Sequence, residues 1–230
     1  MKSYVEEDDH GRTSQALDFE HSYVFAGDIN WYRGLFKRAL DVMCVIFMLP
    51  TALSVIALFA ALVAIDGGNP FYSQIRVGQG GRLFRMWKLR SMVHGADAML
   101  EDHLAANPDA RKEWDATQKL KNDPRVTAIG KIIRKTSVDE LPQLWNVLRG
   151  DMSLVGPRPM MPSQEELYPG RAYYRLRPGI TGPWQISERH LSDFVERARF
   201  DSAYDRELSL GTDFHILRRT ITVVFRATGV

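Results

Sequence analysis

Residues 134–159 read RKTSVDELPQLWNVLRGDMSLVGPRP, and this stretch determines how the rest of the chain is interpreted. Asp139 and Glu140 stand where we expect a helix to begin. Ser137-x-x-Glu140 fits a capping box, and the proline that follows is tolerated only in a first helical turn. Leucine and tryptophan then recur at helical spacing up to Gly150, a typical helix stop. We therefore predict a helix whose N-terminus carries two carboxylates, in a positive field that keeps them ionised.

Positively charged residues flank the two carboxylates. Arg134 and Lys135 lie just upstream, and Arg158 is held between two prolines downstream. Ionised carboxylates beside rigid cations suggest a site for a metal-bound phosphate ester. An acidic pair at the start of a helix is often only a cap, so the short pattern by itself leaves a structural and a catalytic interpretation open.

The complete stretch resembles the signature of a known family. Residues 134–144 and 150–159 match, without gaps, the motifs of the bacterial sugar transferases, which are monotopic phosphoglycosyl transferases. The resemblance implies an enzyme that moves a sugar 1-phosphate from a UDP-sugar to undecaprenyl phosphate and releases UMP. This reaction is the first membrane step of exopolysaccharide or other glycoconjugate synthesis. Residues 95–121 resemble the branch that transfers galactose phosphate, with glucose or an N-acetylated sugar as alternatives.

The resemblance also implies roles for individual residues. Asp139 is expected to be the nucleophile that forms a phosphosugar-aspartyl intermediate, and Glu140 to hold Mg²⁺ or to manage protons. We expect both carboxylates to bind Mg²⁺, because the attacking carboxylate and the diphosphate are both anionic. Arg134, Arg158 and Lys88 are expected to stabilise the phosphoryl oxygens as charge shifts.

Two other functions are compatible with the same residues. If the acidic pair is only a cap, the chain could be a non-catalytic membrane scaffold of a polysaccharide assembly complex. Alternatively, it could be a Mg²⁺-dependent hydrolase that cleaves the diphosphate without a lipid acceptor. The sequence leaves a homodimer open as well.

Length, charge and cysteine content exclude several classes. The 230 residues suit one domain with its own core. A formal charge of +2 and the lack of a DNA- or RNA-binding motif argue against nucleic acid as a partner. Cys44 is the single cysteine, so no intramolecular disulfide can form, which fits a reducing compartment. The histidines show no spacing typical of a zinc site.

An apolar run is the second landmark of the chain. The 24 residues from Val42 to Ile65 include no charged side chain. As a helix they would reach about 36 Å, enough to cross a hydrocarbon core of about 30 Å. Basic residues flank both ends, however, which places both ends in the cytoplasm, and Pro50 kinks the helix midway. A kinked spanning helix and a re-entrant helix that returns to the same face therefore both remain open.

The resemblance favours the re-entrant form, because the membrane element of this family is a helix broken at a Ser-Pro pair. Here that pair is Leu49-Pro50, so the serine is missing. We expect an α+β, mostly helical monotopic membrane protein with amphipathic interfacial helices, on the cytoplasmic face of the bacterial inner membrane. Residues 1–30 are an expected disordered acidic tail, residues 31–66 a basic lead-in and the re-entrant helix, and residues 67–230 the cytoplasmic catalytic domain.

A β-hairpin is predicted after the apolar run. Two extended segments, 71–77 and 83–88, are joined by Gly78-Gln-Gly-Gly81, a turn rather than a nucleotide-binding loop because no helix opens there. Lys88 and Arg90 alternate to one face and could reach phosphate. An exposed basic strand edge explains the same pattern equally well.

Two segments near the C-terminus complete the predicted site and its membrane contact. Residues 177–189 resemble a family loop that would present Gln185 and Arg189 to the nucleotide, although Glu188 replaces a family glycine. Apolar residues at helical spacing, with arginines between them, predict an amphipathic helix over 214–225. This helix either lies on the membrane surface or packs on the core of the domain.

Overall fold

Helices predominate in the computed structural model, which describes residues 31–65, 67–117, 120–187 and 194–225. The helices are α3 (Lys37–Ile65), α4 (Ala96–Ala106), α5 (Pro108–Thr117), α6 (Ala128–Thr136), α7 (Gln143–Arg149), α8 (Ala172–Arg175), α9 (Pro183–Ile186), α10 (Arg197–Glu207) and α11 (Leu210–Phe225). The strands are β1 (Phe71–Val77), β2 (Leu83–Leu89), β3 (Ser153–Val155) and β4 (Gly179–Thr181), and short π or 3-10 segments are η1 (Tyr32–Phe36), η2 (Gln79–Gly81), η3 (Val138–Glu140), η4 (Pro162–Gln164) and η5 (Phe194–Glu196). The predicted mostly helical chain with a small hairpin is confirmed; the parallel pair β3–β4 was not anticipated.

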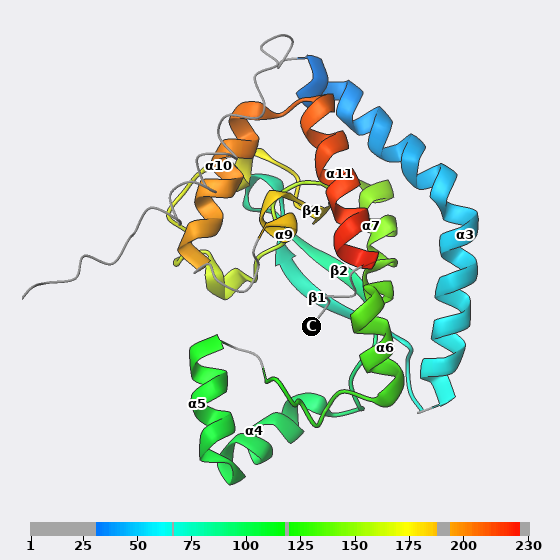
Figure 1. Cartoon of the computed structure of the whole chain (residues 1–230), viewed down its shortest axis with the longest axis vertical. Coiled ribbons are helices and arrows are strands. Elements are labelled where there is room, and N and C mark those ends of the chain that lie inside the picture. The colour runs from blue at the N-terminus through cyan, green and yellow to red at the C-terminus, as the bar shows by residue number, and fades with distance from the viewer. Residues whose placement is uncertain (1–30, 66, 118–119, 188–193, 226–230) are drawn as a thin grey trace, which may run out of the picture.

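The apolar run forms one helix, α3, which curves along one side of the molecule (Figure 1). Helical structure continues through Pro50, so the described chain does not separate into the two helices that we expected. A proline removes only one backbone donor, and the hydrogen bonds on either side of it persist. Ser54 Oγ donates to the Pro50 carbonyl at 3.1 Å. Tyr32–Ile65 is long and apolar enough to cross a membrane, by length and composition, and little of it is buried.

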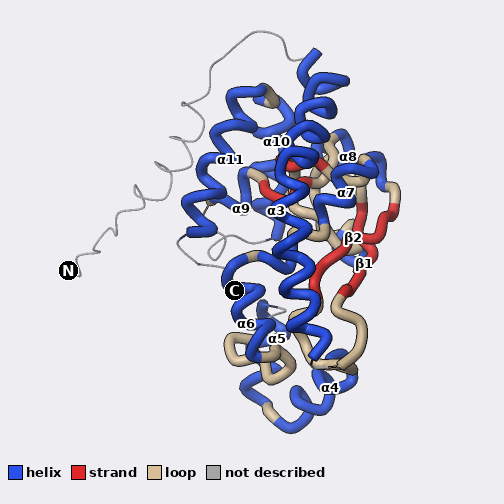
Figure 2. The backbone as a smooth tube through the Cα atoms, turned by 90° about the vertical axis from the view of Figure 1, so that its right-hand side faces the viewer, coloured by secondary structure: helices blue, strands red, loops and turns tan. Residues whose placement is uncertain are grey.

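Both ends of α3 pack against the same domain. Near the start, Val45 is fully buried in one cluster with Val147 of α7, and Arg38 donates to a carbonyl at the end of α7 at 2.8 Å. Near the end, Val63 is buried with Leu89 of β2 and with the helix α6. Figure 1 shows α7 and α6 on the same side of α3, and Figure 2, turned by 90°, shows α3 running along the face of the molecule. The helix is therefore held along its length rather than projecting from the domain.

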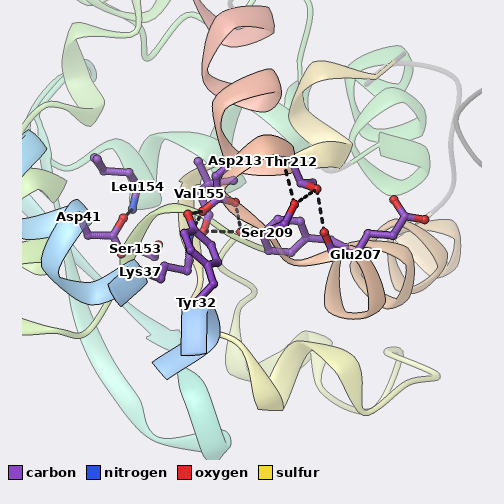
Figure 3. Close-up of polar contacts among 11 residues, drawn as sticks. Tyr32, Lys37, Asp41, Ser153, Leu154, Val155, Glu207, Ser209, Thr212 and Asp213 are labelled. Carbon is purple, nitrogen blue, oxygen red and sulfur yellow. Dashed lines mark hydrogen bonds and ion pairs between the residues drawn. The ribbon is translucent and has the colours of Figure 1, made fainter. Parts of the chain in front are cut away.

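A buried polar network fixes the beginning of α3 to α11 and β3 (Figure 3). Asp213 of α11 accepts hydrogen bonds from Tyr32 Oη at 2.7 Å and from Lys37 Nζ. Asp41 accepts one from Ser153 Oγ at 2.7 Å. Buried carboxylates are costly unless they are paired, and each of these has partners. Asp41 therefore lies inside the domain rather than facing lipid headgroups.

The hairpin has the predicted antiparallel form. Glycines of the Gly78–Gly81 turn adopt positive φ, which explains why glycine is needed there. Tyr72 lies directly opposite Lys88, and Arg76 is four residues further along β1, opposite Phe84. Because side chains alternate in a strand, Tyr72 and these two basic residues share one face, whereas Arg85 lies on the other.

The C-terminal helix α11 has two differently occupied faces. Ile216 is buried in the core at 2% exposure, so one face packs on the domain. Phe214 and Ile221 are 69% and 58% exposed. The structure therefore supports core packing and also leaves an apolar surface on the same helix.

The helices α4 and α5 extend at one end of the molecule (Figures 1 and 2).

Candidate active site

The two carboxylates lie on η3, a 3-10 turn between α6 and α7, and not at the start of the predicted helix. Ser137 adopts the left-handed conformation (φ 57°) and ends α6, donating its N–H to the carbonyl of Arg134 at 3.1 Å. A helix N-cap needs extended backbone, so Ser137 cannot serve as one, and its side chain makes no cap hydrogen bond. The predicted capping box is wrong. The predicted stop at Gly150 is confirmed.

Lys88 brings the hairpin to both carboxylates. Its Nζ donates to Glu140 Oε1 at 2.9 Å and to Asp139 Oδ2 at 3.3 Å. The side chains of Lys88, Asp139 and Glu140 are 24%, 13% and 28% exposed. This ion cluster is therefore partly desolvated but open to a ligand on one side, which strengthens its charge interactions relative to water.

The charge environment of Asp139 differs from the predicted one, in which the positive field of a helix N-terminus keeps the carboxylate ionised. Burial raises the pKa of Asp139, and the neighbouring Glu140 carboxylate raises it further; Lys88 and Arg134 oppose both effects. Burial lowers the pKa of Lys88, but the two carboxylates outweigh it, so that pKa is raised. The field of a helix terminus is thus not what keeps Asp139 ionised. Lys88 and Arg134 only partly offset these increases, and the pKa of Asp139 stays above its usual value.

Two of the expected phosphate-binding arginines lie near this cluster. Arg134 donates from Nε to Ser91 Oγ at 2.9 Å, and its charge lowers the pKa of Asp139. Arg158 stacks over the ring of Trp184, 5.6 Å from its centroid, and its charge opposes protonation of Lys88. The structure therefore brings Lys88, Arg134 and Arg158 around one pair of carboxylates.

The other three expected ligand-binding residues are placed differently. Arg90 donates to the carbonyls of Val63 (3.0 Å) and Gly67, so its guanidinium caps the end of α3. Gln185 lies on α9 and is 5% exposed. Arg189 falls outside the described residues.

Two further arginines that sequence reasoning missed lie close to Arg158. Arg197 donates from Nη2 to the Arg158 carbonyl at 2.7 Å and stacks on the same Trp184 ring at 5.2 Å. Arg76 shares the Lys88 face of the hairpin. The register of the hairpin could have indicated that Arg76 shares a face with Lys88. No local sequence signal marks Arg197 as part of the site, because it is distant in sequence from Arg158.

Residues 32–227 match the family model described as Bacterial sugar transferase. The chain belongs to the bacterial sugar transferase family. It is 47% identical over 195 residues to an undecaprenyl-phosphate galactose phosphotransferase of Salmonella typhimurium, covering 84% of this chain and 41% of that protein. A UDP-galactose-lipid carrier transferase of Erwinia amylovora shows the same identity and coverage. The chain thus spans about two fifths of the length of these two relatives. The exopolysaccharide production protein ExoY of Rhizobium meliloti is 45% identical over 199 residues, covering 85% of this chain and 88% of that protein.

The donor atoms at this site suit a magnesium ion that also binds substrate. No group of three or more His, Cys, Asp or Glu side chains able to hold a metal occurs among the described residues. Asp139 and Glu140 supply hard carboxylate oxygens from adjacent positions. Mg²⁺ is commonly held by one or two carboxylates together with substrate phosphates and water. The residues therefore fit such an ion.

Proposed function

We propose that this sugar transferase moves galactose 1-phosphate from UDP-galactose to undecaprenyl phosphate and releases UMP. The observation that carries the proposal is the partly buried Asp139–Glu140 pair, held by Lys88 and flanked by Arg134 and Arg158. The names of the Salmonella and Erwinia relatives support galactose and the lipid phosphate as substrates. The whole arrangement suits an anionic ligand that contains phosphate.

In the proposed reaction Asp139 acts as the nucleophile. An oxygen of its carboxylate bonds to the β-phosphorus, and the bond from that phosphorus to the bridging oxygen breaks, so that UMP leaves with the electron pair. An oxygen of undecaprenyl phosphate then attacks the same phosphorus, and the bond to Asp139 breaks. The carboxylate is regenerated, and no net proton is taken up or released when all phosphates keep their charge.

Contacts of the two carboxylates support this division of roles. Lys88 lies closer to Glu140 (2.9 Å) than to Asp139 (3.3 Å). The longer contact leaves Asp139 more available for attack, while Glu140 retains the ammonium group. Asp139 is also the more buried of the two, and a desolvated carboxylate is a stronger nucleophile than a hydrated one.

Asp139 and Glu140 would hold Mg²⁺. When bound, the ion neutralises the diphosphate and reduces its repulsion of the carboxylate. Lys88, Arg134 and Arg158 bind and orient the phosphoryl oxygens from the protein side.

We propose that α3 is re-entrant and that the domain lies on the cytoplasmic face of the inner membrane. Support comes from the packing of both ends of α3 against one domain, through Val45 near the start and Val63 near the end. A helix that crossed the bilayer would place its two ends on opposite sides of the membrane, where one domain could not contact both. Exposed Phe214 and Ile221 of α11 provide a second contact with the lipid surface.

A UMP-release assay tests the function. Purified protein in detergent receives Mg²⁺, undecaprenyl phosphate and one of several UDP-sugars, and we expect the highest release with UDP-galactose. Asp139→Asn should abolish release and the covalent adduct seen by mass spectrometry, whereas Asp109→Asn on the exposed surface of α5 should leave both intact. Absence of release with every sugar would favour a scaffold. Repeated turnover without the lipid, beyond the one UMP per protein released when the adduct forms, would favour a hydrolase.

A further inference from the structure

Three arginine side chains from distant parts of the chain meet beside the candidate active site. Arg158 and Arg197 stack on one indole ring, with their guanidinium carbons 5.6 and 5.2 Å from its centroid. Arg76 is positioned with them, because the next residue of β1 donates its N–H to the Met160 carbonyl at 3.0 Å. We call Arg76, Arg158 and Arg197 the arginine cluster.

The arginine cluster carries positive charge that the described chain does not neutralise. None of its three guanidiniums forms an ion pair with any carboxylate side chain that the structure describes. The Nε of Arg76 is buried and has no hydrogen-bond partner in that part of the chain. Burial, and then the charge of Arg158, lowers the pKa of Arg76 to about 10. Like charges held together out of water are costly, and an anion between them would relieve that cost.

The nearby acid does not supply this anion. Asp201 lies on α10 near Arg197, but its carboxylate accepts a hydrogen bond from Tyr168 Oη at 2.9 Å. It is 2% exposed, and burial raises its pKa to about 6. Asp201 therefore belongs to the core beside Arg197. Its charge favours the protonated form of Arg197, but no ion pair joins the two, and neither Arg76 nor Arg158 has an acidic partner among the described ion pairs.

The position of the arginine cluster indicates which phosphate it would bind. On the hairpin, Arg76 lies opposite Phe84, four residues along β2 from Lys88, which corresponds to about 13 Å at the rise of a strand. Lys88 contacts Asp139, so Arg76 and Asp139 serve different ends of a ligand. In phosphoryl transfer the leaving group departs roughly in line with the attacking oxygen and on the opposite side. The departing phosphate is thus the one farther from Asp139.

We propose that Arg76 and Arg197, together with Arg158, bind the phosphate of the departing nucleoside monophosphate. This inference rests on the proposed function, in which the leaving group is UMP. It adds two phosphate-binding residues to those expected from the sequence and gives the arginine cluster a role separate from that of Lys88. The Trp184 ring, packed against two of the guanidiniums, keeps them in fixed orientations.

Isotope exchange without a lipid acceptor tests this inference. Protein, Mg²⁺, UDP-galactose and labelled UMP are mixed, and appearance of the label in UDP-galactose measures the first half-reaction alone. For Arg76→Gln and for Arg197→Gln we expect the KM for UMP to rise about ten-fold or more, the loss typical of a charge-assisted hydrogen bond. Calorimetric binding of UMP without Mg²⁺ should weaken in parallel.

Matched controls come from the same two elements. Arg85→Gln removes a charge from the other face of the hairpin, and Arg199→Gln removes an exposed charge from α10. Both should stay within about two-fold of the wild-type protein, as surface substitutions usually do. If Arg197→Gln does not fold, Arg197→Lys and Arg76→Gln carry the test.

The outcomes distinguish this inference from the proposed function. Exchange by the wild-type protein that is weakened in the Arg76 and Arg197 variants supports both. Wild-type exchange with unchanged KM and unchanged UMP binding in those variants overturns the role of the arginine cluster and leaves the proposed function intact. No exchange by the wild-type protein overturns the covalent mechanism and this inference with it.

Discussion

The ammonium nitrogen of Lys88 lies 2.9 Å from Glu140 Oε1, although 52 residues separate them in the sequence. This contact joins the hairpin to η3 and places one cation against two adjacent carboxylates. We predict that Lys88→Met lowers the kcat of UMP release by about 100-fold or more, as loss of a preorganised electrostatic partner commonly does. Lys112→Met, on the exposed surface of α5, is the control. A kcat equal to that of the wild-type protein would show that Lys88 is only structural.

The Arg158 guanidinium stacks on Trp184 and lies close enough to Lys88 to affect its pKa. Arg158→Lys keeps the charge but replaces a planar fork by a point charge. We predict that kcat/KM for UDP-galactose falls by about 10- to 100-fold, measured by UMP release. Arg149→Lys changes a 60% exposed side chain in the same way and should have little effect. Wild-type kinetics for Arg158→Lys would argue against phosphate binding by this residue.

The buried pair Lys37–Asp213 joins α3 to α11, with side chains 11% and 7% exposed. Asp213→Ala leaves the ammonium group and the hydroxyl of Tyr32 without their acceptor. We predict a loss of about 3–5 kcal/mol in the free energy of unfolding, measured by thermal or chemical denaturation in detergent. Glu101→Ala, which removes a 71% exposed partner, should change it by less than about 0.5 kcal/mol.

A double variant separates the effect of the unpaired Lys37 charge from the effect of the hydrogen bonds that Asp213 accepts. The double variant Lys37→Met, Asp213→Leu removes both charges and should regain much of the stability lost in Asp213→Ala. Equal instability of the two variants would mean that hydrogen bonds to Asp213, including that from Tyr204 at 2.6 Å, matter more than the ion pair.

Asp201 makes stability depend on pH. Burial raises its pKa to about 6 in the folded protein, from 3.8. Its contribution to stability is therefore fully present below about pH 4 and is lost as the pH rises through 6. Relative to Asp201→Asn, the wild-type protein should lose about 2 kcal/mol between pH 4.5 and 7.5. Unfolding of both proteins at the two pH values measures this difference, and parallel pH profiles would contradict it.

The proposed re-entrant path of α3 predicts that both flanks are reached from one side. In a Cys44→Ser background, Ser22→Cys precedes the helix and Asp109→Cys follows it on an exposed position of α5. A membrane-impermeant maleimide should label both cysteines in inside-out vesicles and neither in right-side-out vesicles. Labelling of the two from opposite sides would establish a spanning helix. The Cys44→Ser protein without an added cysteine is the control for background.

Local features of the chain were predictable from sequence. The apolar run from Val42 to Ile65 is helical, glycines make the turn of the hairpin, and Gly150 ends α7. Each of these depends on neighbouring residues only, through periodicity or backbone freedom. The acidic pair was identified because its motif is contiguous and long, and that motif also indicated the family, which the match over 32–227 confirms.

Tertiary structure decided how those elements meet. Ser137 fits a cap by its type, yet it adopts left-handed backbone because α6 must end there for η3 to reach Lys88. Arg90, expected at the phosphates, instead caps α3. Arg197 contacts Arg158, which lies 39 positions earlier in the chain. Sequence by itself determined the long apolar helix and the hairpin, because short-range periodicity and backbone preference specify them, and its contiguous motif marked the acidic pair as the candidate site. Only the fold decided that Arg197 joins Arg158 and that Arg90 caps α3 instead of reaching the phosphates, because contacts between residues far apart in the chain depend on packing that no local pattern encodes.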